Sequence, residues 1–192
     1  MKQQDYFSLY KELLLKWQKA VNLVAPSTLS DIENRHFKDS EQLYQYIPAK
    51  AEILVDFGSG AGFPALVLAI LNQVNQGSLK NIYLIESDTK KCLFLKEVIR
   101  QSGLSARVLN RRIESVQNIK ADVITARALA PLDDLLKFSR PFCHKKTVCL
   151  FLKGKMADQE IQNTEIPCQI LKIPSVVHPD GCVLKITEVA DD

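Results

Sequence analysis

The sequence is poor in the residues that build metal centres and disulfide frameworks. It contains three histidines and five cysteines among 192 residues, and no two cysteines form a Cys-x-x-Cys pair. Most cysteines lie inside apolar runs, such as the one around Cys149, where a thiol packs as a small apolar side chain. We therefore predict buried, reduced cysteines in a cytoplasmic protein, and no metal site.

Long apolar runs are also missing. None approaches the length needed to cross a bilayer, and Lys2, Asp5, Lys11 and Glu12 interrupt any secretory signal at the start of the sequence. These absences predict a chain with no membrane partner. With 46% hydrophobic and 24% charged residues, the composition is that of a globular domain.

Net charge is low, at +3, but its distribution is uneven. Residues 80–120 contain nine Lys or Arg and four Asp or Glu, a balance of +5, and residues 137–155 contain six basic residues and no acidic one. Residues 156–192 contain two basic and seven acidic residues, a balance of −5. This asymmetry suits either a basic surface for phosphate backbones or ordinary solvated helix faces, and the charges alone leave both open.

Hydrophobic periodicity divides the chain near residue 50. Residues 1–50 show helical spacing over 6–21 and 34–46, with a loop at Pro26, and are predicted to form a helical extension packed on the same domain. Over residues 51–192, strand-like runs alternate with helical segments that begin near Pro64, Thr89, Arg111 and Leu132. The predicted strands are 53–57, 82–85, 107–109, 122–125, 147–152, 169–173 and 183–187.

This alternation predicts an α/β fold with a Rossmann-like, doubly wound sheet of seven strands. Only eight turn-prone residues, 174–181, separate the last two runs. Because they cannot hold a helical crossover, the final pair is predicted to be an antiparallel hairpin. Such a sheet differs from the six-stranded parallel dinucleotide fold.

The sharpest motif is a glycine-rich turn after the first predicted strand, where Gly58, Gly60 and Gly62 precede Pro64. Alternating glycines at a strand–helix junction permit positive φ angles and let a ligand approach the backbone at the end of the strand. Read from Gly60, the spacing also fits the Gly-x-Gly-x-x-Ala variant of the dinucleotide motif. The glycines alone therefore do not choose between cofactors.

Of two carboxylates near this turn, Asp56 favours S-adenosylmethionine, whereas the role expected of Glu86 would be the same with a dinucleotide. Asp56 lies two residues before the first glycine, where it would repel a pyrophosphate and attract an ammonium and a sulfonium. Glu86 ends the second predicted strand, where it can accept hydrogen bonds from both ribose hydroxyls. Asp88 could contact the ligand or cap the next helix. The candidate cofactor residues of this region are Asp56, Gly58, Ser59, Gly60 and Glu86.

The sequence holds no recognisable catalytic base. Residues 125–131 lack the Asn/Asp-Pro-Pro-aromatic box of enzymes that methylate exocyclic amines, and Cys143 lies outside the Pro-Cys context of carbon-5 pyrimidine methylation. An acceptor with a free lone pair, such as guanine N7, needs no base, so proximity and alignment would suffice without a catalytic side chain. Arg127 follows a central strand and is predicted to face the crevice, where it could hold a carboxylate, a phosphate or guanine O6. An ion pair with Asp133 or Asp134 is the alternative.

Six motifs occur in order along the chain. They are Trp17-x4-Asn22-Leu, Arg35-His-Phe-x-Asp-Ser40, Val55-Asp-Phe-Gly-Ser-Gly-Ala-Gly-Phe-Pro64, Arg112-Ile-Glu114, Ala126-Arg-Ala128 and Leu152-Lys-Gly154. With these motifs the chain resembles the bacterial ribosomal RNA small subunit methyltransferase G family, also called glucose-inhibited division protein B. The Gly-Phe-Pro extension of the glycine turn and the Arg35-His36 pair are more specific than the glycines.

The resemblance implies the class I methyltransferase fold and S-adenosylmethionine-dependent N7 methylation of one guanine in 16S rRNA. The partner would be naked 16S rRNA, the small ribosomal subunit or an assembly intermediate. Arg35, His36 and Lys153 are candidates for RNA contact or for support of the substrate pocket. The cofactor contacts that the resemblance implies are Gly58, Phe63, Ile113, Glu114 and Arg127.

The chain departs from the family pattern at a few positions. Ala65 and Val67 stand where the family usually has a glycine and a second proline, which should affect helix packing more than ligand contacts. The stretch after Gly181 lacks an arginine common in the family, which weakens the case for RNA contact from the C-terminal region. Two other functions stay open: a NAD-dependent oxidoreductase, and a non-catalytic RNA-binding or ribosome-assembly protein.

Overall fold

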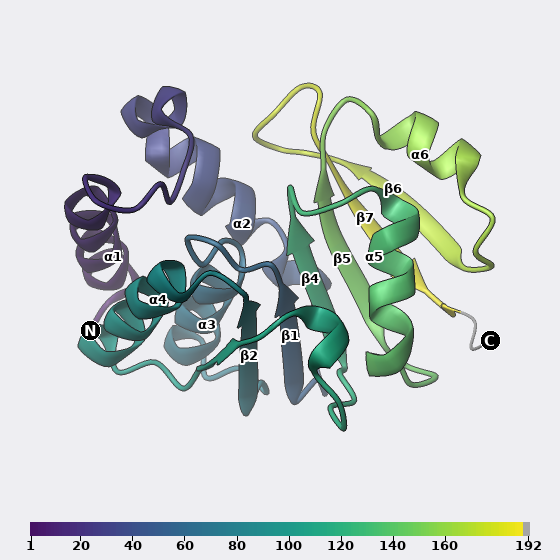
Figure 1. Cartoon of the computed structure of the whole chain (residues 1–192), viewed down its shortest axis with the longest axis horizontal. Helices are drawn as coiled ribbons and strands as arrows, with labels where there is room; N and C mark the ends of the chain where they lie inside the picture. Colours follow the sequence, from purple (N-terminus) through teal and green to yellow (C-terminus); the bar gives the residue numbers. More distant parts are fainter. Residues whose placement is uncertain (190–192) are drawn as a thin grey trace.

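The computed structural model describes residues 1–189 and contains a seven-stranded sheet between two layers of helices (Figure 1). The strand order is β3-β2-β1-β4-β5-β7-β6, and neighbouring strands are parallel except in the two pairs that include β7. The predicted α/β sheet and its antiparallel final hairpin are therefore confirmed. The last three residues of the predicted 51–192 region lie outside the described residues. The strands are β1 (Ile53–Phe57), β2 (Asn81–Glu86), β3 (Arg107–Asn110), β4 (Val123–Arg127), β5 (Val148–Lys153), β6 (Gln169–Pro174) and β7 (Cys182–Thr187).

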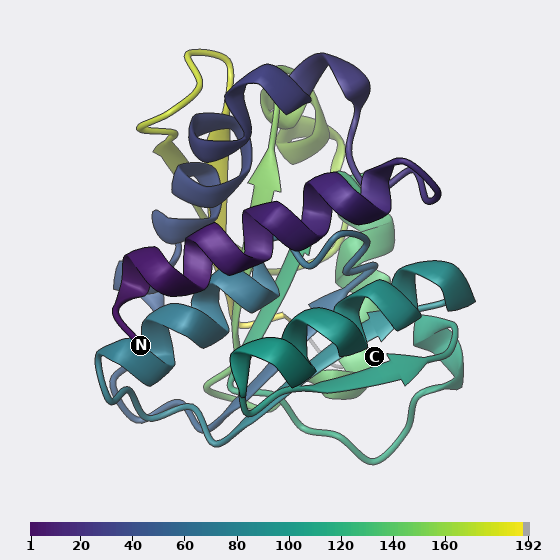
Figure 2. The same cartoon turned by 90° about the vertical axis from the view of Figure 1, so that its left-hand side faces the viewer.

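Each face of the sheet is buried under its own helical layer. One core lies between the sheet and α1 (Gln3–Gln18), α3 (Ala65–Val74) and α4 (Thr89–Ser102). Figure 2 shows α1 lying across this side with α4 below it, and α1 packs against both α3 and α4. The second core lies under α5 (Leu132–Ser139), the 3-10 turn η5 (Arg140–Phe142) and α6 (Ala157–Asn163).

Helix α3 is the most deeply buried helix-forming segment. Its residues 65–71 are all buried, because the sheet lies on one side and the N-terminal segment on the other. Ala65 and Val67 are fully buried in this core, as expected for positions that determine packing. Since α3 follows the glycine turn directly, its burial fixes the exit of that turn.

The N-terminal segment is helical, but less regularly than predicted. The helix predicted over 34–46 is not one continuous helix. A π-helical stretch comes first, and a short α-helical and a short 3-10 segment follow it. The loop predicted at Pro26 is wrong, since these residues form a 3-10 helix in which Thr28 Oγ1 donates to the carbonyl of Ala25. The elements are η1 (Pro26–Asp31), η2 (Glu33–Lys38), α2 (Asp39–Glu41) and η3 (Tyr44–Tyr46).

Two further helix predictions need correction. The helix expected near Arg111 is only the 3-10 turn η4 (Ile113–Ser115). The connection is otherwise extended, because the buried side chains of Ile113 and Val116 anchor it to the core. It changes direction at Asn118, which has a φ of 63°. Helix α6, between β5 and β6, was not predicted. Its short sequence buries one residue, Ala157, and so has little periodicity to detect.

Other expectations concern the environment of the chain. All five cysteines are free thiols, and four are buried, as predicted, while Cys168 is half-buried. Within residues 1–189, no helix combines the length and apolarity that a membrane crossing requires. In the same part of the chain, no three His, Cys, Asp or Glu side chains converge as metal ligands would.

Candidate active site

Strand alternation gathers polar side chains at one edge of the sheet. Successive side chains of a strand point to opposite faces, and Leu54, Leu84 and Val123 point into the core beneath α3 and α4. Residues an even number of positions further along each strand therefore share that face and lie nearer its carboxyl end. This places on one side of the sheet Asp56, Glu86, Thr125 and Arg127.

A cleft of about 890 Å³ opens at this edge. The glycine turn forms its floor with the ends of β4 and β5, while the N-terminal segment and the β6–β7 loop form its sides. In Figure 1 the N-terminal segment lies to the upper left of the upward-pointing arrowhead of β4, and the β6–β7 loop lies above it. The cleft therefore lies at the carboxyl ends of the parallel strands, where open α/β sheets bind ligands.

The glycine turn adopts the backbone conformation that its sequence predicts. Gly58, Gly60 and Gly62 have φ angles of 59°, 55° and 92°, a region that costs glycine little. A Cβ atom on Gly60 would meet only the carbonyl of Gly58, at 3.7 Å, so the space above the turn is open to a ligand. Pro64 directly precedes α3, as predicted.

Glu86 fixes this turn to the second strand. Its Oε2 accepts a hydrogen bond of 2.8 Å from the backbone N–H of Gly60, and its Oε1 accepts one of 2.8 Å from the N–H of Asp88. The carboxylate is thus oriented at the strand tip with lone pairs to spare for hydroxyl donors. Asp88 caps α4 by accepting from the N–H groups of Lys90 and Lys91, which confirms the capping alternative.

Asp56 is the unusual group of the site. It is fully buried, its Oδ1 accepts a bond of 2.6 Å from Thr125 Oγ1, and its Oδ2 has no partner among the described residues. The β1–β4 register pairs Asp56 with Thr125, which explains their contact. Burial raises the pKa of Asp56 to about 7, although the nearby hydroxyls of Ser59 and Thr125 and the charge of Arg127 oppose the rise. A buried carboxylate with a bare oxygen is poised to receive a cationic ligand.

Arg127 faces the cleft, as predicted, but its ion pair is with a residue of the N-terminal segment. Its Nη1 lies 3.5 Å from Asp39 Oδ2, and its guanidinium carbon lies 5.0 Å from the centre of the Phe63 ring. The alternative partners are engaged elsewhere, since Asp133 accepts from Thr164 and Asp134 pairs with Lys137. The guanidinium is therefore positioned by the segment that precedes the sheet.

His36 acts in this network as a neutral acceptor. Arg127 Nη2 can only donate, so its 2.9 Å contact with His36 Nδ1 leaves the proton on Nε2, which donates to Thr28 Oγ1 at 2.8 Å. Burial, together with the charges of Arg127 and Arg35, lowers the pKa of His36 to about 3. His36 is thus a packed support of Arg127 at neutral pH. The neighbouring Arg35 has an exposed side chain at the cleft wall.

Lys153 is not a solvated surface lysine. Its side chain points to the face opposite Arg127, toward α6, where Nζ lies 2.5 Å from Glu160 Oε2 and donates to the carbonyl of Ala130 at 3.0 Å. Glu160 Oε2 also accepts from the backbone N–H of Leu132. This trio ties the loop after β4 to β5 and α6, and so shapes the second wall of the cleft.

Ile113 and Glu114 lie away from this cleft. Ile113 packs in the second core, Glu114 is exposed, and both line a separate hollow of about 420 Å³ beside η5. The structure therefore groups ten of the twelve sequence candidates around the glycine turn and the cleft. The remaining two are at the tip beyond β3.

Sequence reasoning missed several residues of the site. Asp39 stood within the Arg35–Ser40 motif at helical spacing from Arg35 and His36, which is a signal that could have identified it. Thr125 and Glu160 carried no local signal, because only strand register and the α6 packing bring them to their partners. Gln42 anchors the β6–β7 loop: its Nε2 donates to Ser175 Oγ at 3.3 Å and its Oε1 accepts from the N–H of Val176 at 3.2 Å.

Comparison with known proteins agrees with this geometry. The fold matches a ribosomal protein methylase from Lactobacillus delbrueckii subsp. bulgaricus, with a TM-score of 0.63, 15% identity and coverage of 81% of this chain and 79% of that one. It also matches a Methanococcus maripaludis protein described as S-adenosyl-L-methionine-dependent methyltransferase, with a TM-score of 0.60, 12% identity and coverage of 86% and 93%. These matches support the class I methyltransferase fold.

Sequence relatives are much closer. The ribosomal RNA small subunit methyltransferase G of Paramagnetospirillum magneticum is 46% identical over 95% of this chain and 87% of its own length. The protein of the same name from Rhodospirillum centenum is 43% identical over 97% and 84%. The family model for rRNA small subunit methyltransferase G matches residues 3–182. A cleft with an arginine beside a glycine turn and a bare carboxylate thus accompanies a family match over nearly the whole length, and the chain belongs to the rRNA small subunit methyltransferase G family.

Proposed function

We propose that this protein transfers a methyl group from S-adenosylmethionine to N7 of one guanine in 16S rRNA. The observation that carries the proposal is the buried Asp56 carboxylate beneath an open glycine turn, whose Oδ2 has no hydrogen-bond partner within residues 1–189. A pyrophosphate-bearing cofactor would bring negative charge to this carboxylate, whereas an ammonium or a sulfonium would complete its interactions. The donor therefore suits the site and NAD does not.

The residues around the turn fit such a donor. Gly58, Ser59, Gly60 and Phe63 would border it, and Glu86 would accept from its ribose hydroxyls. Ile113 and Glu114 lie outside the cleft, beyond the end of β3 that pairs with Glu86. They would meet the adenine there, with Ile113 as an apolar wall. When bound, the donor supplies an electrophilic methyl group on sulfur. The two side chains that would orient its charged end are Asp56 and Arg127. The Asp56 carboxylate would attract its ammonium group, and the Arg127 guanidinium can bind its carboxylate.

Guanine N7 suits this site because the two nitrogen bases beside Arg127 and at the end of β5 are already engaged. His36 is neutral, and both of its ring nitrogens are engaged. Lys153 is held by Glu160 and by a backbone carbonyl. N7 carries a lone pair and loses no proton before attack, so these side chains need only hold the reactants in line. From its place over the Phe63 ring, the Arg127 guanidinium can donate a hydrogen bond to guanine O6.

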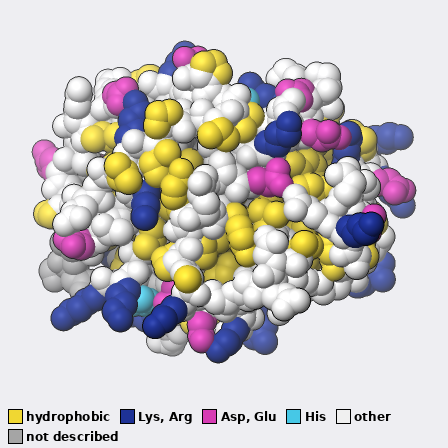
Figure 3. All heavy atoms as spheres, turned by 180° about the vertical axis from the view of Figure 1, so that it is seen from behind, with side chains coloured by type: hydrophobic (Ala, Val, Ile, Leu, Met, Phe, Trp, Pro, Cys, Tyr) yellow, Lys and Arg dark blue, Asp and Glu magenta, His cyan; other side chains and the backbone are white. Residues whose placement is uncertain are grey.

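We further propose that the RNA reaches the site along basic side chains at its mouth. Arg35 and Lys155 are exposed at the cleft and can contact phosphates, while His36 and Lys153 support its walls. From behind, other Lys and Arg side chains gather along the lower margin of the molecule (Figure 3). Because the strands point upward in Figure 1, that margin is at the opposite end from the site. RNA binding would therefore depend on basic side chains at the mouth of the cleft rather than on all the basic residues of 80–120 and 137–155.

Residues 1–50 would act as part of the methyltransferase unit formed by residues 51–192, because Asp39 and His36 hold Arg127. The reaction would take place in the cytoplasm, with 16S rRNA presented as naked RNA, in the small subunit or in an assembly intermediate. A tritiated-methyl transfer assay with these three substrates separates the possibilities. Mapping of the labelled base to a guanine N7 is the expected result.

Two outcomes would overturn the proposal in favour of an alternative function. Saturable binding of NAD(H) without binding of S-adenosylmethionine in calorimetry would favour an oxidoreductase. Binding of 16S rRNA with no label transferred to any of the three substrates would favour a non-catalytic RNA-binding or assembly protein. A labelled base other than guanine would leave methyl transfer intact and reject only the acceptor.

A further inference from the structure

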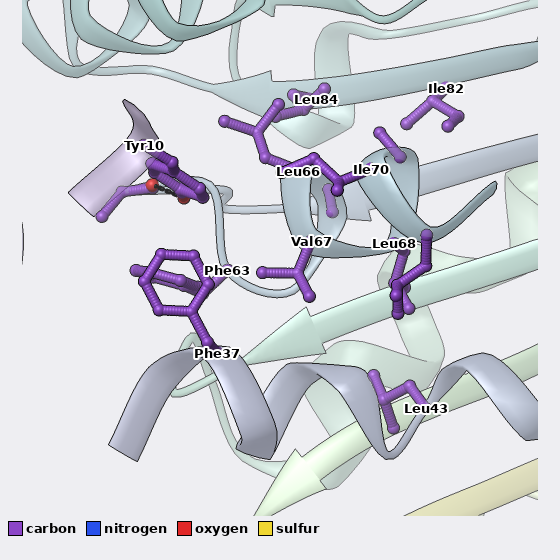
Figure 4. Packing of buried hydrophobic residues seen from close by; sticks show 14 of the residues in the cluster. Tyr10, Phe37, Leu43, Phe63, Leu66, Val67, Leu68, Ile70, Ile82 and Leu84 are labelled. Carbon is purple, nitrogen blue, oxygen red and sulfur yellow. Dashed lines mark hydrogen bonds between the residues drawn. The ribbon is translucent and has the colours of Figure 1, made fainter. Parts of the chain in front are cut away.

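Helix α1 reaches the glycine turn through one side chain. Tyr10 is almost fully buried, and its hydroxyl donates a hydrogen bond to the backbone carbonyl of Ala61, between the second and third glycines. Figure 4 shows the Tyr10 hydroxyl directed at this turn, with Phe63 next to the ring. The two groups are 51 residues apart in sequence, so this contact exists only in the folded chain.

The turn is shaped around this tyrosine. A Cβ atom on Gly62 would lie 2.6 Å from the Tyr10 hydroxyl oxygen and 2.5 Å from Leu66 Cδ1, so the third glycine lets α1 and α3 close on the turn. The amide side of the same turn is held separately, because the Gly60 N–H donates to Glu86. Tyr10 and Glu86 thus fix the carbonyl and the amide sides of one short loop.

The ring of Tyr10 extends the contact toward Arg127. It stacks on Phe63 with ring centres 5.1 Å apart and an angle of 16° between the planes. Phe63 in turn lies 5.0 Å from the His36 ring and carries the Arg127 guanidinium over its face. The same aromatic side chain therefore connects the donor turn to the arginine network.

We infer that Tyr10 is a positioning residue for the methyl donor, whose hydroxyl holds the Ala61 carbonyl and so the conformation of residues 60–63. This inference rests on the proposed function, since it assumes that the turn receives the donor. Burial raises the pKa of Tyr10 well above its ordinary value, so the hydroxyl remains a donor throughout the range in which the protein is assayed. Its effect should therefore be independent of pH.

The chain offers a matched control on the same helix. Tyr6 is also buried, but its hydroxyl accepts a 2.7 Å bond from Gln73 Nε2 on α3, away from the glycine turn. We compare Tyr10→Phe with Tyr6→Phe by calorimetry with S-adenosylmethionine and by methyl-transfer kinetics. Tyr10→Phe leaves a buried carbonyl without its donor, so the donor Kd should rise about tenfold, whereas Tyr6→Phe should change it less than about twofold.

The kinetic pattern separates positioning from a loss of folded protein. Tyr10→Phe should raise the KM for the donor with kcat changed less than about threefold, at every pH tested. Equal donor Kd values for the two variants would overturn the inference. If Tyr10→Phe is too unstable for kinetics, hydrogen exchange of residues 59–63 in the cold decides: faster exchange than in Tyr6→Phe supports positioning, and equal exchange rejects it. Failure of the wild-type chain to bind the donor would reject the proposed function itself.

Discussion

The two halves of the cleft are built in different ways. The donor half is nearly continuous in sequence, since Asp56, the glycine turn and Phe63 lie within residues 56–63, and Glu86 is at the next strand tip. The acceptor half is assembled from separate segments, because Arg127 meets Asp39 and His36, and Lys153 donates to the carbonyl of Ala130. The donor half can therefore be recognised as a motif in the sequence, whereas the acceptor half cannot.

The halves also differ in how completely their polar groups are paired. In the acceptor half, each buried cation has a carboxylate within 3.5 Å, namely Asp39 for Arg127 and Glu160 for Lys153. In the donor half, Asp56 Oδ2 is buried and has no partner in the part of the chain that the structure describes. A paired wall keeps its shape without ligand, whereas an unpaired carboxylate gains most when a cation binds. We therefore expect the donor half to respond to ligand and pH, and the acceptor half to respond mainly to loss of a partner.

The largest expected effect concerns the arginine at the junction of the two halves. Arg127→Ala should lower methyl transfer by roughly a thousandfold, because a preorganised charge next to the reacting groups is lost. Donor Kd should change less than about tenfold, since Asp56 and Glu86 remain. The domain should stay folded, because Asp39, whose pKa burial already raises, can take up a proton when its partner is removed.

Single-turnover kinetics and calorimetry measure the two effects of Arg127→Ala. Arg100→Ala serves as the control, because Arg100 is an exposed residue of α4 paired only with the neighbouring Glu97. Normal activity of Arg127→Ala would remove this residue from the site. A loss of donor binding as large as the loss of transfer would assign it to the donor half.

A second change isolates the donor half. Asp56→Asn keeps the shape of the side chain but removes the charge available to a cationic ligand, so donor affinity should fall about a hundredfold. Calorimetry measures the affinity, and Asp134→Asn, at a half-buried position on α5 that does not line the cleft, is the control. Unchanged donor affinity in Asp56→Asn would show that the carboxylate does not meet the ligand.

The same carboxylate predicts how stability depends on pH. The pKa of Asp56 is raised from 3.8 to about 7 in the folded chain, so between these values the unfolded chain has released a proton that the folded chain retains. The free energy of unfolding of the ligand-free protein should therefore fall as pH rises. Relative to Asp56→Asn, the wild type should lose about 2 to 3 kcal/mol between about pH 5 and pH 8.

Chemical denaturation of both ligand-free proteins at several pH values measures this difference. Curves that stay parallel from acid to alkaline pH would contradict a raised pKa at Asp56. Saturating donor should reduce the difference in the wild type, because the ligand stabilises the ionised form.

The smallest effect is expected at the far wall of the acceptor half. Glu160→Gln weakens the contacts to Lys153 and to the Leu132 N–H, so the loop after β4 should be less well fixed. Methyl transfer should fall about tenfold with donor Kd unchanged. Asp158→Asn on the same helix, where Asp158 pairs with exposed Lys172, is the matched control. Equal activities of the two variants would limit Glu160 to a structural role.

The accuracy of the sequence predictions follows the same division. All seven strands were found, because each is a short apolar run between polar turns. The helix predicted near Arg111 was wrong, since a crossover with two buried apolar residues resembles a short amphipathic helix in sequence. Arg127 was correctly directed into the cleft by its place after a central strand. The alternative ion pair with Asp133 or Asp134, which are close in sequence, is replaced by one with the distant Asp39.

The sequence by itself determined the sheet, the glycine turn, the carboxylates at two strand tips and the family to which the chain belongs. These features depend on local periodicity and on contiguous motifs, which are readable without knowing what packs against them. Only the tertiary structure decided that Asp39 pairs with Arg127, that Glu160 holds Lys153 and that Tyr10 supports the donor turn. The first and third of these contacts join segments far apart in sequence, with 51 residues between Tyr10 and Ala61. Strand order and helix packing, rather than any local pattern, bring the partners together.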